Sequence, residues 1–379
     1  MKAILPDYNN NIVNVSATLA NYLGAPVGMP TIKILEDELS KGYTNVVFIV
    51  MDGMGKKILE KHLPEKSFLR RHIKQTVTSV FPSTTTNATT TILSATTPSQ
   101  HGWFAWAMNF GERTVRLFRD NDYYSNETLE AGFVREKLPY KKFFEKTGND
   151  IQCFTVVPKK LGHDISAGHH RTFETMEFMF EVLGSVCKTP KKKFVYSYFS
   201  DFDTMMHNYG TQGKQAHKML VKFNKYVTKL KKECPNTLIV VTADHGQVDL
   251  TQNGHVEIYK DRAIMDCLSH NLSLDPRGAA FHVKSGMKGA FKKAFEKYTD
   301  DFYLFETDVL IEMGVFGKFS KAGYERLRPF LGDYMAGGKD TGKMLVFAAG
   351  KEYTSQGNIY KGHHTGMTED EMFVPLIII

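Results

Sequence analysis

The sequence predicts an α/β fold in which a mostly parallel central sheet is flanked by helices and carries an inserted cap. Short apolar runs rich in β-branched residues alternate with amphipathic stretches, as at residues 46–51 (VVFIVM) and 238–241 (LIVV). Strands buried on both faces have this composition. The 379 residues exceed a minimal domain, and 42% hydrophobic with 23% charged residues is an ordinary globular balance. We expect a core at 1–247 and 342–379 and a cap region at 248–341.

Composition narrows the possible partners. A net charge of +7 and a pI of about 8.9 suit small anionic ligands such as phosphates. The densest basic run, residues 188–193 (KTPKKK), is typical of a solvated loop, so no nucleic-acid polymer is expected. The four cysteines are widely spaced and form no CxxC, which predicts reduced thiols in a cytoplasmic protein. No segment resembles a signal peptide or a run of about 18 apolar residues, so no membrane partner is expected, and the oligomeric state stays open.

The first elements are two helices and a strand. Residues 17–23 predict a short helix ended by Gly24, and residues 31–39 predict a helix with Thr31 as its cap. Residues 46–51 predict a buried strand that ends in Asp52. A carboxylate at the end of a buried strand is a candidate ligand at the edge of the sheet.

Three consecutive threonines follow the next strand. Residues 76–81 predict that strand, Pro82 ends it, and residues 88–95 predict a helix, so Thr84, Thr85 and Thr86 lie near a helix N-terminus. A helix cap needs only one hydroxyl. A hydroxyl there is also well placed to attack phosphate, because the free N–H groups attract the anion. Residue type alone does not choose among the three.

Both tryptophans follow in residues 101–110 (HGWFAWAMNF). Trp103 and Trp106 fit core packing and a stacking wall beside a pocket equally well. Residues 151–157 and 193–199 then predict two further strands.

A second candidate ligand pair follows the strand at 193–199. Asp203 and His207 are four residues apart, so on a helical turn they share a face and can bind one cation. The two methionines between them indicate burial. Residues 211–232 predict a long amphipathic helix with lysines on its solvated face.

The strand at 238–241 ends in Asp244 and His245. Alone, these residues fit an ordinary turn as well as a metal site. Residues 248–341 are choppier, and a core strand returns at 344–348. The adjacent His363 and His364 then lie in a Gly-flanked loop before a terminal strand at 373–379, and at least one of them is expected to be a ligand.

Taken together, these strand ends supply enough ligands for two divalent cations. Three Asp, two or three His and one hydroxyl give each ion three protein ligands and an open position. Zinc is the expected metal, with manganese as the alternative. One ion would activate the hydroxyl as a nucleophile, and the other would bind the leaving oxygen.

The ordered set of motifs resembles the nucleotide pyrophosphatase/phosphodiesterase branch of the alkaline phosphatase superfamily, over nearly the whole chain. The motifs are VFIVMDGMG, SVFPSTTTNATTTILSATTPSQHGW, SDFDTMMHNYG, TADHGQ and HHTGMTEDEM. The resemblance implies an alkaline-phosphatase-like core, Thr85 as the nucleophile and a covalent phosphothreonine. It places Asp52, Thr85, Asp244 and His245 on one metal, and Asp203, His207 and His364 on the other.

One position departs from the family. The phosphodiesterases it resembles have a phosphate-binding Asn shortly after the HG, where this chain has Trp106, and Asn109 is the nearest amide. We therefore expect Asn109, Trp106 and Trp103 beside a small phosphorylated substrate, possibly a nucleotide. The expected activity is hydrolysis of phosphodiester or nucleotide pyrophosphate bonds. The alternatives are a phosphonate hydrolase or phosphomonoesterase that uses the same site and, least favoured, a non-catalytic metal-binding protein.

Overall fold

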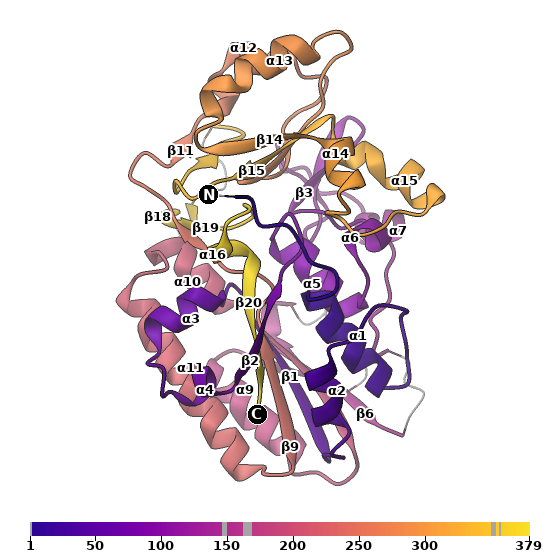
Figure 1. The fold of residues 1–379 in the computed structure, drawn as a ribbon, viewed down its shortest axis with the longest axis vertical. Helices are drawn as coiled ribbons and strands as arrows, with labels where there is room; N and C mark the ends of the chain where they lie inside the picture. The colour runs from indigo at the N-terminus through magenta and orange to yellow at the C-terminus, as the bar shows by residue number, and fades with distance from the viewer. Residues whose placement is uncertain (1, 146–149, 162–168, 350–353, 356–357) are drawn as a thin grey trace.

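A seven-stranded sheet forms the centre of the lower half of the molecule (Figure 1). The computed structural model describes residues 2–145, 150–161, 169–349, 354–355 and 358–379. The strand order is β2-β20-β9-β1-β8-β6-β7, and every strand except β20 runs in one direction. The mostly parallel sheet is therefore confirmed. Its strands are β1 Asn45–Met51, β2 Ile73–Thr78, β6 Gln152–Pro158, β7 His169–Phe173, β8 Lys193–Phe199, β9 Thr237–Thr242 and β20 Phe373–Ile378.

The central strands are fully buried, as their apolar runs predicted. Every residue of β1, β8 and β9 is buried. Met51 pairs with Phe199, and the Asp52 N–H donates to the Phe199 carbonyl at 3.0 Å. Because the strands are parallel and in register, the loops that follow them begin at one edge of the sheet.

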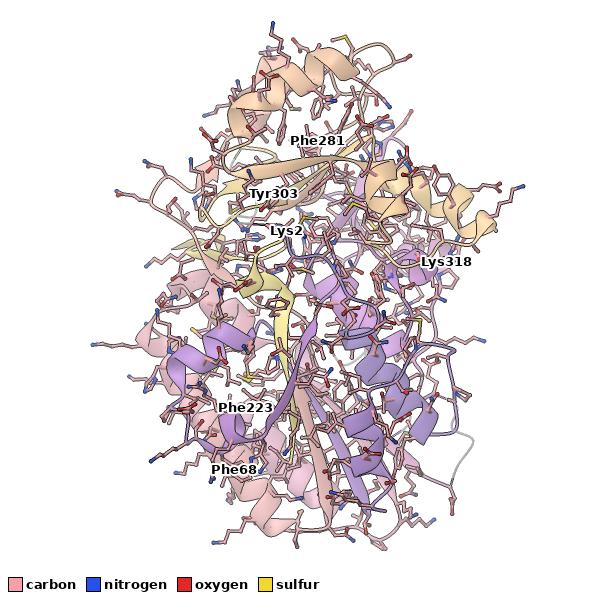
Figure 2. All side chains as sticks on the ribbon, viewed as in Figure 1. Lys2, Phe68, Phe223, Phe281, Tyr303 and Lys318 are labelled. Carbon is pink, nitrogen blue, oxygen red and sulfur yellow. The ribbon has the colours of Figure 1, made fainter. Side chains whose placement is uncertain are left out.

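Helices cover both faces of this sheet (Figure 1). One face carries α1 Ile12–Tyr22, α2 Lys33–Leu39 and α5 Thr85–Ser94. The other carries α3 Lys56–His62, α4 Phe68–Arg71, α9 Met176–Cys187, α10 Asp201–Tyr209 and α11 Lys214–Glu233. In α11, apolar residues such as Phe223 are buried in the core while the lysines lie outside (Figure 2).

Several expected boundaries differ from the structure. Helix α1 begins at Ile12 rather than 17, because Asn11 caps it through a bond from the Val13 N–H. Helix α2 begins at Lys33 after Ile32, whose carbonyl accepts the first helical bonds, so Thr31 is not its cap. Strand β2 covers 73–78 rather than 76–81, because pairing with β20 fixes its extent. Helix α5 begins at Thr85, three residues before 88.

A second seven-stranded sheet forms the upper half, in the order β14-β15-β13-β12-β3-β4-β5 (Figures 1 and 2, near Phe281 and Tyr303). Its strands are β3 Ala107–Phe110, β4 Arg113–Arg116, β5 Asn121–Asp122, β12 Ser273–Asp275, β13 Gly278–Phe281, β14 Phe302–Glu306 and β15 Tyr334–Gly338. Leu274 pairs with Ala107, so this sheet combines strands from the expected cap and from the expected core. The division at 248 and 341 stays a prediction. Residues 107–122, which we expected in the core, supply three strands of this second sheet.

Shorter elements complete the described chain. The helices are α6 Pro98–His101, α7 Phe133–Lys137, α12 Arg262–Met265, α13 Lys288–Phe295, α14 Thr307–Glu312, α15 Lys321–Leu327 and α16 Glu369–Met372, with short 3₁₀ turns at η1 Lys159–Leu161, η2 Ile258–Lys260, η3 Glu296–Tyr298 and η4 Arg328–Leu331. The strands are β10 Val248–Asp249, β11 His255–Val256, β16 Met344–Leu345, β17 Thr354–Ser355, β18 Asn358–Ile359 and β19 Gly362–His363. Within the described ranges, every helix is too short or too polar to cross a membrane.

Candidate active site

A cavity of about 630 Å³ lies where the carboxyl edge of the central sheet meets the second sheet. Asp52, Thr85, Asp203, His207 and His364 line it from the side of the central sheet. Trp106 and Asp275, next to and within strands of the second sheet, also line it. The expected ligands therefore face one space, although more than three hundred positions separate the first from the last.

One group of ligand atoms lies at the ends of β1 and β9. Single ligand atoms of Asp52, Asp244 and His245 lie within 4.8 Å of one another. His245 Nε2 is 3.4 Å from Asp52 Oδ1 and 3.6 Å from Asp244 Oδ2. Both of these carboxylate oxygens are buried and have no hydrogen-bond partner in the described part of the chain. Buried orphan oxygens are costly unless a cation or donor meets them, so this group fits a metal ion.

Thr85 reaches the same group from the first turn of α5. Its Oγ1 lies 3.3 Å from His245 Nε2. Thr84 is the N-cap residue, in extended conformation, so Thr85 is the first helical residue. Thr86 has its buried Oγ1 without a partner among the described residues and does not line the cavity.

A second group adjoins the first. Ligand atoms of Asp203, His245 and His364 also lie within 4.8 Å of one another. His207 Nε2 lies 3.2 Å from Asp203 Oδ2, and His364 Nε2 lies 3.8 Å from Asp203 Oδ1. His245 and His364 stack with ring centroids 3.9 Å apart. The two groups are thus contiguous, and the pairing of Asp203 with His207 follows from their i, i+4 spacing in α10.

Three histidines share one hydrogen-bond pattern, in which Nδ1 contacts a backbone carbonyl and Nε2 faces the carboxylates. Nδ1 of His207, His245 and His364 lies 2.8, 3.0 and 3.0 Å from the carbonyls of Gly362, Gly246 and Ser83. A carbonyl only accepts, so each Nδ1 carries the proton and each Nε2 presents a lone pair. Backbone bonds of this kind orient metal-binding histidines.

His363 is arranged differently, although it also lines the cavity. Its Nδ1 contacts the backbone N and O of His364, at 2.9 and 2.8 Å. Among the described residues it forms no ion pair with a carboxylate. The geometry thus favours His364 as the ligand.

Burial and neighbouring charges shift the pKa values of the carboxylates and histidines of the site. Burial raises the pKa of Asp52 well above its usual range, and the charges of Asp244 and Asp203 raise it further. Burial also acts to raise the pKa of Asp203, but His207, His364 and His245 outweigh it and lower that pKa. Burial and the charge of His245 lower the pKa of His364. A divalent cation would favour ionised carboxylates and neutral imidazoles together.

Comparison with known proteins identifies the family. Residues 46–308 match the family described as type I phosphodiesterase / nucleotide pyrophosphatase. The chain belongs to this family. It is a phosphoric ester hydrolase, and the expected resemblance is confirmed. No curated protein sequence matches the chain significantly.

Solved structures share the fold of this phosphodiesterase-family chain at low sequence identity. Human ectonucleotide pyrophosphatase / phosphodiesterase 5 aligns with a TM-score of 0.58 and 15% identity, covering 88% of this chain and 87% of that one. The murine protein aligns with a TM-score of 0.56 and 15% identity, covering 87% of each chain. Phosphonoacetate hydrolase from Sinorhizobium meliloti 1021, in complex with phosphonoformate, aligns with a TM-score of 0.63 and 15% identity, covering 88% and 89%.

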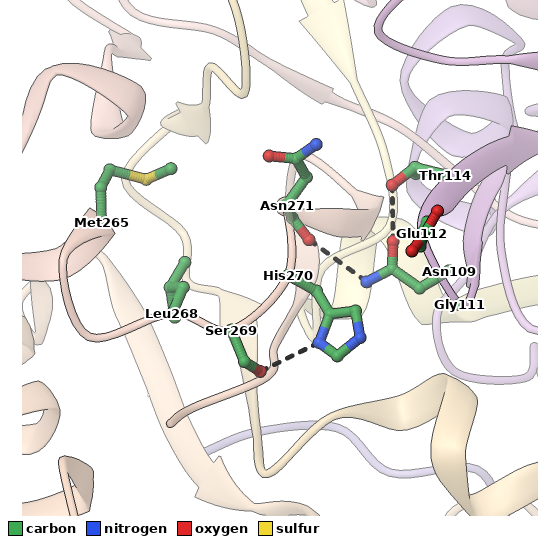
Figure 3. A pocket seen from close by; sticks show the side chains of 9 residues that line it. All are labelled: Asn109, Gly111, Glu112, Thr114, Met265, Leu268, Ser269, His270 and Asn271. Atoms are coloured by element: carbon green, nitrogen blue, oxygen red, sulfur yellow. Dashed lines mark hydrogen bonds between the residues drawn. The ribbon is translucent and has the colours of Figure 1, made fainter. Parts of the chain in front are cut away.

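Two of the three expected substrate-binding residues of this phosphodiesterase-family chain lie away from the cavity. Trp103 is buried in an apolar cluster that includes side chains of the second sheet, and its Nε1–H donates to the Leu138 carbonyl at 2.7 Å. Asn109 pairs across β3 and β4 with Thr114, whose hydroxyl donates to its Oδ1 at 2.5 Å. Asn109 lines a separate cavity of about 400 Å³. Its amide nitrogen donates there to the Asn271 carbonyl at 3.2 Å (Figure 3). Of the three expected substrate-binding residues, Trp106 is the one that lines the cavity of the ligand groups.

The structure adds site residues that the sequence analysis missed. The Tyr198 hydroxyl donates to Asp52 Oδ2, and the Gln247 amide donates to Asp203 Oδ1 at 2.5 Å. Asp275 is buried at the end of β12 and accepts from the Trp106 N–H at 3.0 Å. Burial raises the pKa of the Asp275 carboxyl to about 7. Tyr198 and Gln247 adjoin the ends of β8 and β9, where a search of strand ends would have found them.

A buried ion pair holds the His364 loop against the second sheet. Arg277 Nε and Nη2 donate to the two carboxylate oxygens of Glu371 at 2.7 and 2.9 Å, and both side chains are fully buried. Glu371 also accepts from the Gly366 N–H at 2.7 Å and from the Thr368 hydroxyl at 2.8 Å. The Arg277 N–H donates to the hydroxyl of Thr365, the residue after His364, at 3.0 Å. Nothing in the residue spacing indicates this contact.

Proposed function

We propose that this chain hydrolyses phosphodiester or nucleotide pyrophosphate bonds with two divalent metal ions and that Thr85 is the nucleophile. The observation that carries the proposal is the position of Thr85, with Oγ1 3.3 Å from His245 Nε2 at the N-terminus of α5. Thr84 and Thr89 also line the cavity with Asp52, but Thr85 is the threonine whose hydroxyl contacts the first ligand group, through His245.

The donor set suits two zinc ions, with manganese as the alternative. Asp52, Asp244 and His245 would hold one ion with Thr85, and Asp203, His207 and His364 would hold the other. Imidazole nitrogen with carboxylate oxygen is a common zinc donor set. When bound, the two ions would supply charge stabilisation and favour the ionised hydroxyl.

The chain's own groups then provide the rest of the chemistry. The Thr85 hydroxyl loses its proton to solvent as Oγ1 forms the bond to phosphorus, and the bond to the leaving oxygen breaks with its electron pair on that oxygen. Water later hydrolyses the phosphothreonine and restores the hydroxyl. The free N–H groups of the first turn of α5 favour the phosphoryl oxygens. Tyr198 and Gln247 hold Asp52 and Asp203 in place through the bonds described above.

The walls of the cavity support a substrate with a planar ring. Trp106, Phe118, Tyr123, Phe347 and Tyr360 line it, and aromatic side chains stack on bases. An inactive variant of the murine relative, with a threonine-to-alanine substitution, was solved in complex with AMP. This supports both a threonine nucleophile and a nucleotide substrate. The S. meliloti phosphonoacetate hydrolase, solved with phosphonoacetate, supports phosphonate hydrolysis as a second candidate.

A substrate panel tests the proposal. Bis-p-nitrophenyl phosphate, p-nitrophenyl phosphate, thymidine 5′-monophosphate p-nitrophenyl ester and phosphonoacetate should be assayed with zinc and with manganese. We expect the diester and the nucleotide ester to be the preferred substrates. Preferred turnover of p-nitrophenyl phosphate or phosphonoacetate would select the alternative functions.

Metal content gives a separate test. Protein purified without chelator should carry close to two transition-metal ions per chain by elemental analysis, because two contiguous ligand groups are present. One ion or none in an active preparation would contradict the two-metal site.

A further inference from the structure

One of the described residues that line the cavity is an exposed arginine. Arg119 is exposed and lines the cavity. Its guanidinium lies over the Trp106 ring, 5.4 Å from the centroid. Among the residues that the structure describes, no carboxylate forms an ion pair with it. The other cation of this wall, Lys160, is already paired with Asp201 at 2.9 Å.

Arg119 shares the cavity with the second ligand group. Asp203, His207 and His364 line the same cavity, and so does Tyr360. Tyr360 stacks on His207, with ring centroids 4.4 Å apart, and His207 contacts Asp203. Arg119 is therefore a cation in the same space as the ligand groups, and it is not one of the residues that would hold the ions.

The local backbone holds Arg119 at this position. The Arg119 N–H donates to the Arg116 carbonyl at 3.1 Å in the turn after β4. The buried Arg116 side chain donates to the carbonyls of Asp122 and Tyr123 at 3.0 and 2.9 Å. A guanidinium offers planar paired donors that match phosphate and carboxylate oxygens.

We propose that Arg119 binds a second anionic group, carried by the leaving portion of the substrate. This inference rests on the proposed function and narrows it to substrates whose leaving group is itself charged. The ions would hold the phosphoryl group that is attacked, and in the candidate substrates the further anion is carried by the part that departs in the in-line displacement. The shared chemistry is an anion, and two sources fit: the pyrophosphate of a nucleoside triphosphate and the carboxylate of a phosphonocarboxylate.

Matched substrates separate this role from general binding. Thymidine 5′-triphosphate and thymidine 5′-monophosphate p-nitrophenyl ester transfer the same group but differ in leaving-group charge. Phosphonoacetate and its carboxyl methyl ester form the second pair. Arg119→Met should lower kcat/KM for the charged member of a pair by about 10- to 100-fold and change the uncharged member less than about threefold. Arg119→Lys should recover part of the loss. Which pair responds identifies the source.

The control is Arg113→Met on the same hairpin. Arg113 pairs with Glu127 at 3.1 Å, is exposed and does not line the cavity. It should leave both members of each pair unchanged. Equal losses for both members of a pair in Arg119→Met, or no loss for either, would overturn the inference.

A binding measurement distinguishes failure of this inference from failure of the proposed function. Titration calorimetry of the zinc-loaded protein should show that Arg119→Met weakens the binding of inorganic pyrophosphate more than the binding of orthophosphate. The difference between these two effects should shrink at high salt. If the wild type cleaves none of the four substrates, the proposed function fails, and this titration still decides the role of Arg119. Equal pyrophosphate affinity in wild type and variant would refute it.

Discussion

Glu371→Gln tests whether the buried ion pair with Arg277 holds the His364 loop in place. Glu371 accepts four hydrogen bonds at 2.7 to 2.9 Å, two of them from Arg277, and both side chains are fully buried. The amide keeps the shape but removes the charge, which leaves the guanidinium buried without its anion. Breaking a buried pair in this way costs about 3–5 kcal/mol. That is a large part of the roughly 5–15 kcal/mol that stabilises a typical domain.

The assay is urea unfolding of metal-loaded protein, followed by circular dichroism. Asp37→Asn is the matched control. Asp37 pairs with Lys33 on an exposed helix face, so this substitution should leave the free energy of unfolding close to that of wild type. The double variant Arg277→Met with Glu371→Leu should be more stable than Glu371→Gln, because it leaves no buried charge. A Glu371→Gln protein within about 1 kcal/mol of wild type, or a double variant that is less stable still, would refute the reasoning.

The same substitution should also weaken the metal held by His364. Gly366 and Thr368 bond to Glu371 within the same loop. We therefore expect zinc titration to show one weakened site and one that is nearly unchanged. Equal affinities at both sites would show that the ion pair stabilises the fold without positioning the ligand.

Three further predictions follow from the site. Thr85→Ala should abolish turnover while metal is largely retained, whereas Thr84→Ala and Thr86→Ala should keep most activity, and Thr84→Ala should leave the helix cap intact because the Thr84 side chain forms no capping bond; a phosphoenzyme mapped by mass spectrometry to Thr84 or Thr86 would contradict this. His364→Ala should lose one metal and most activity, and His363→Ala should cost less, because His364 is the one of these two histidines that directs Nε2 at Asp203; elemental analysis and kcat decide, and the reverse ranking would show that His363 is the ligand. In metal-free protein, the pKa of Asp275 is about 7 in the folded state and near 3.8 in the unfolded state. Proton binding to Asp275 therefore stabilises the folded state fully below about pH 4, and this contribution is lost as pH rises through about 7. Asp275→Asn should remove up to about 4 kcal/mol of this pH dependence in urea unfolding with chelator, and an identical pH slope in both proteins would refute it.

The sequence predicted the elements whose signal is local. Apolar runs located β1, β8 and β9 to within about one residue, because fully buried parallel strands carry a continuous pattern. The side chains at their ends met as expected, because parallel strands deliver their carboxyl ends to one edge.

The missed features depend on contacts between distant segments. Asn109 was chosen by its distance from Gly102 along the chain, but the pairing of β3 with β4 directs its amide to Thr114. The pairing of Leu274 with Ala107 joins two segments that are 167 positions apart in the sequence. No short pattern specifies such a pairing, and none specifies the contact between Arg277 and Glu371.

Because two sheets meet at one cavity, ion binding and choice of substrate depend on different parts of the fold. Selection can therefore change one of these properties without the other. Asp52, Asp203 and Asp244 belong to the central sheet and its helices, whereas Trp106, Arg119 and Asp275 come from the second sheet and its turns. Substitutions in the second set can alter which molecule is accepted while the ion-binding residues stay untouched. A lineage built on this plan can diversify its substrates in small steps, and a laboratory library restricted to residues 106–123 and 273–276 would sample the same variation without disturbing the chemistry.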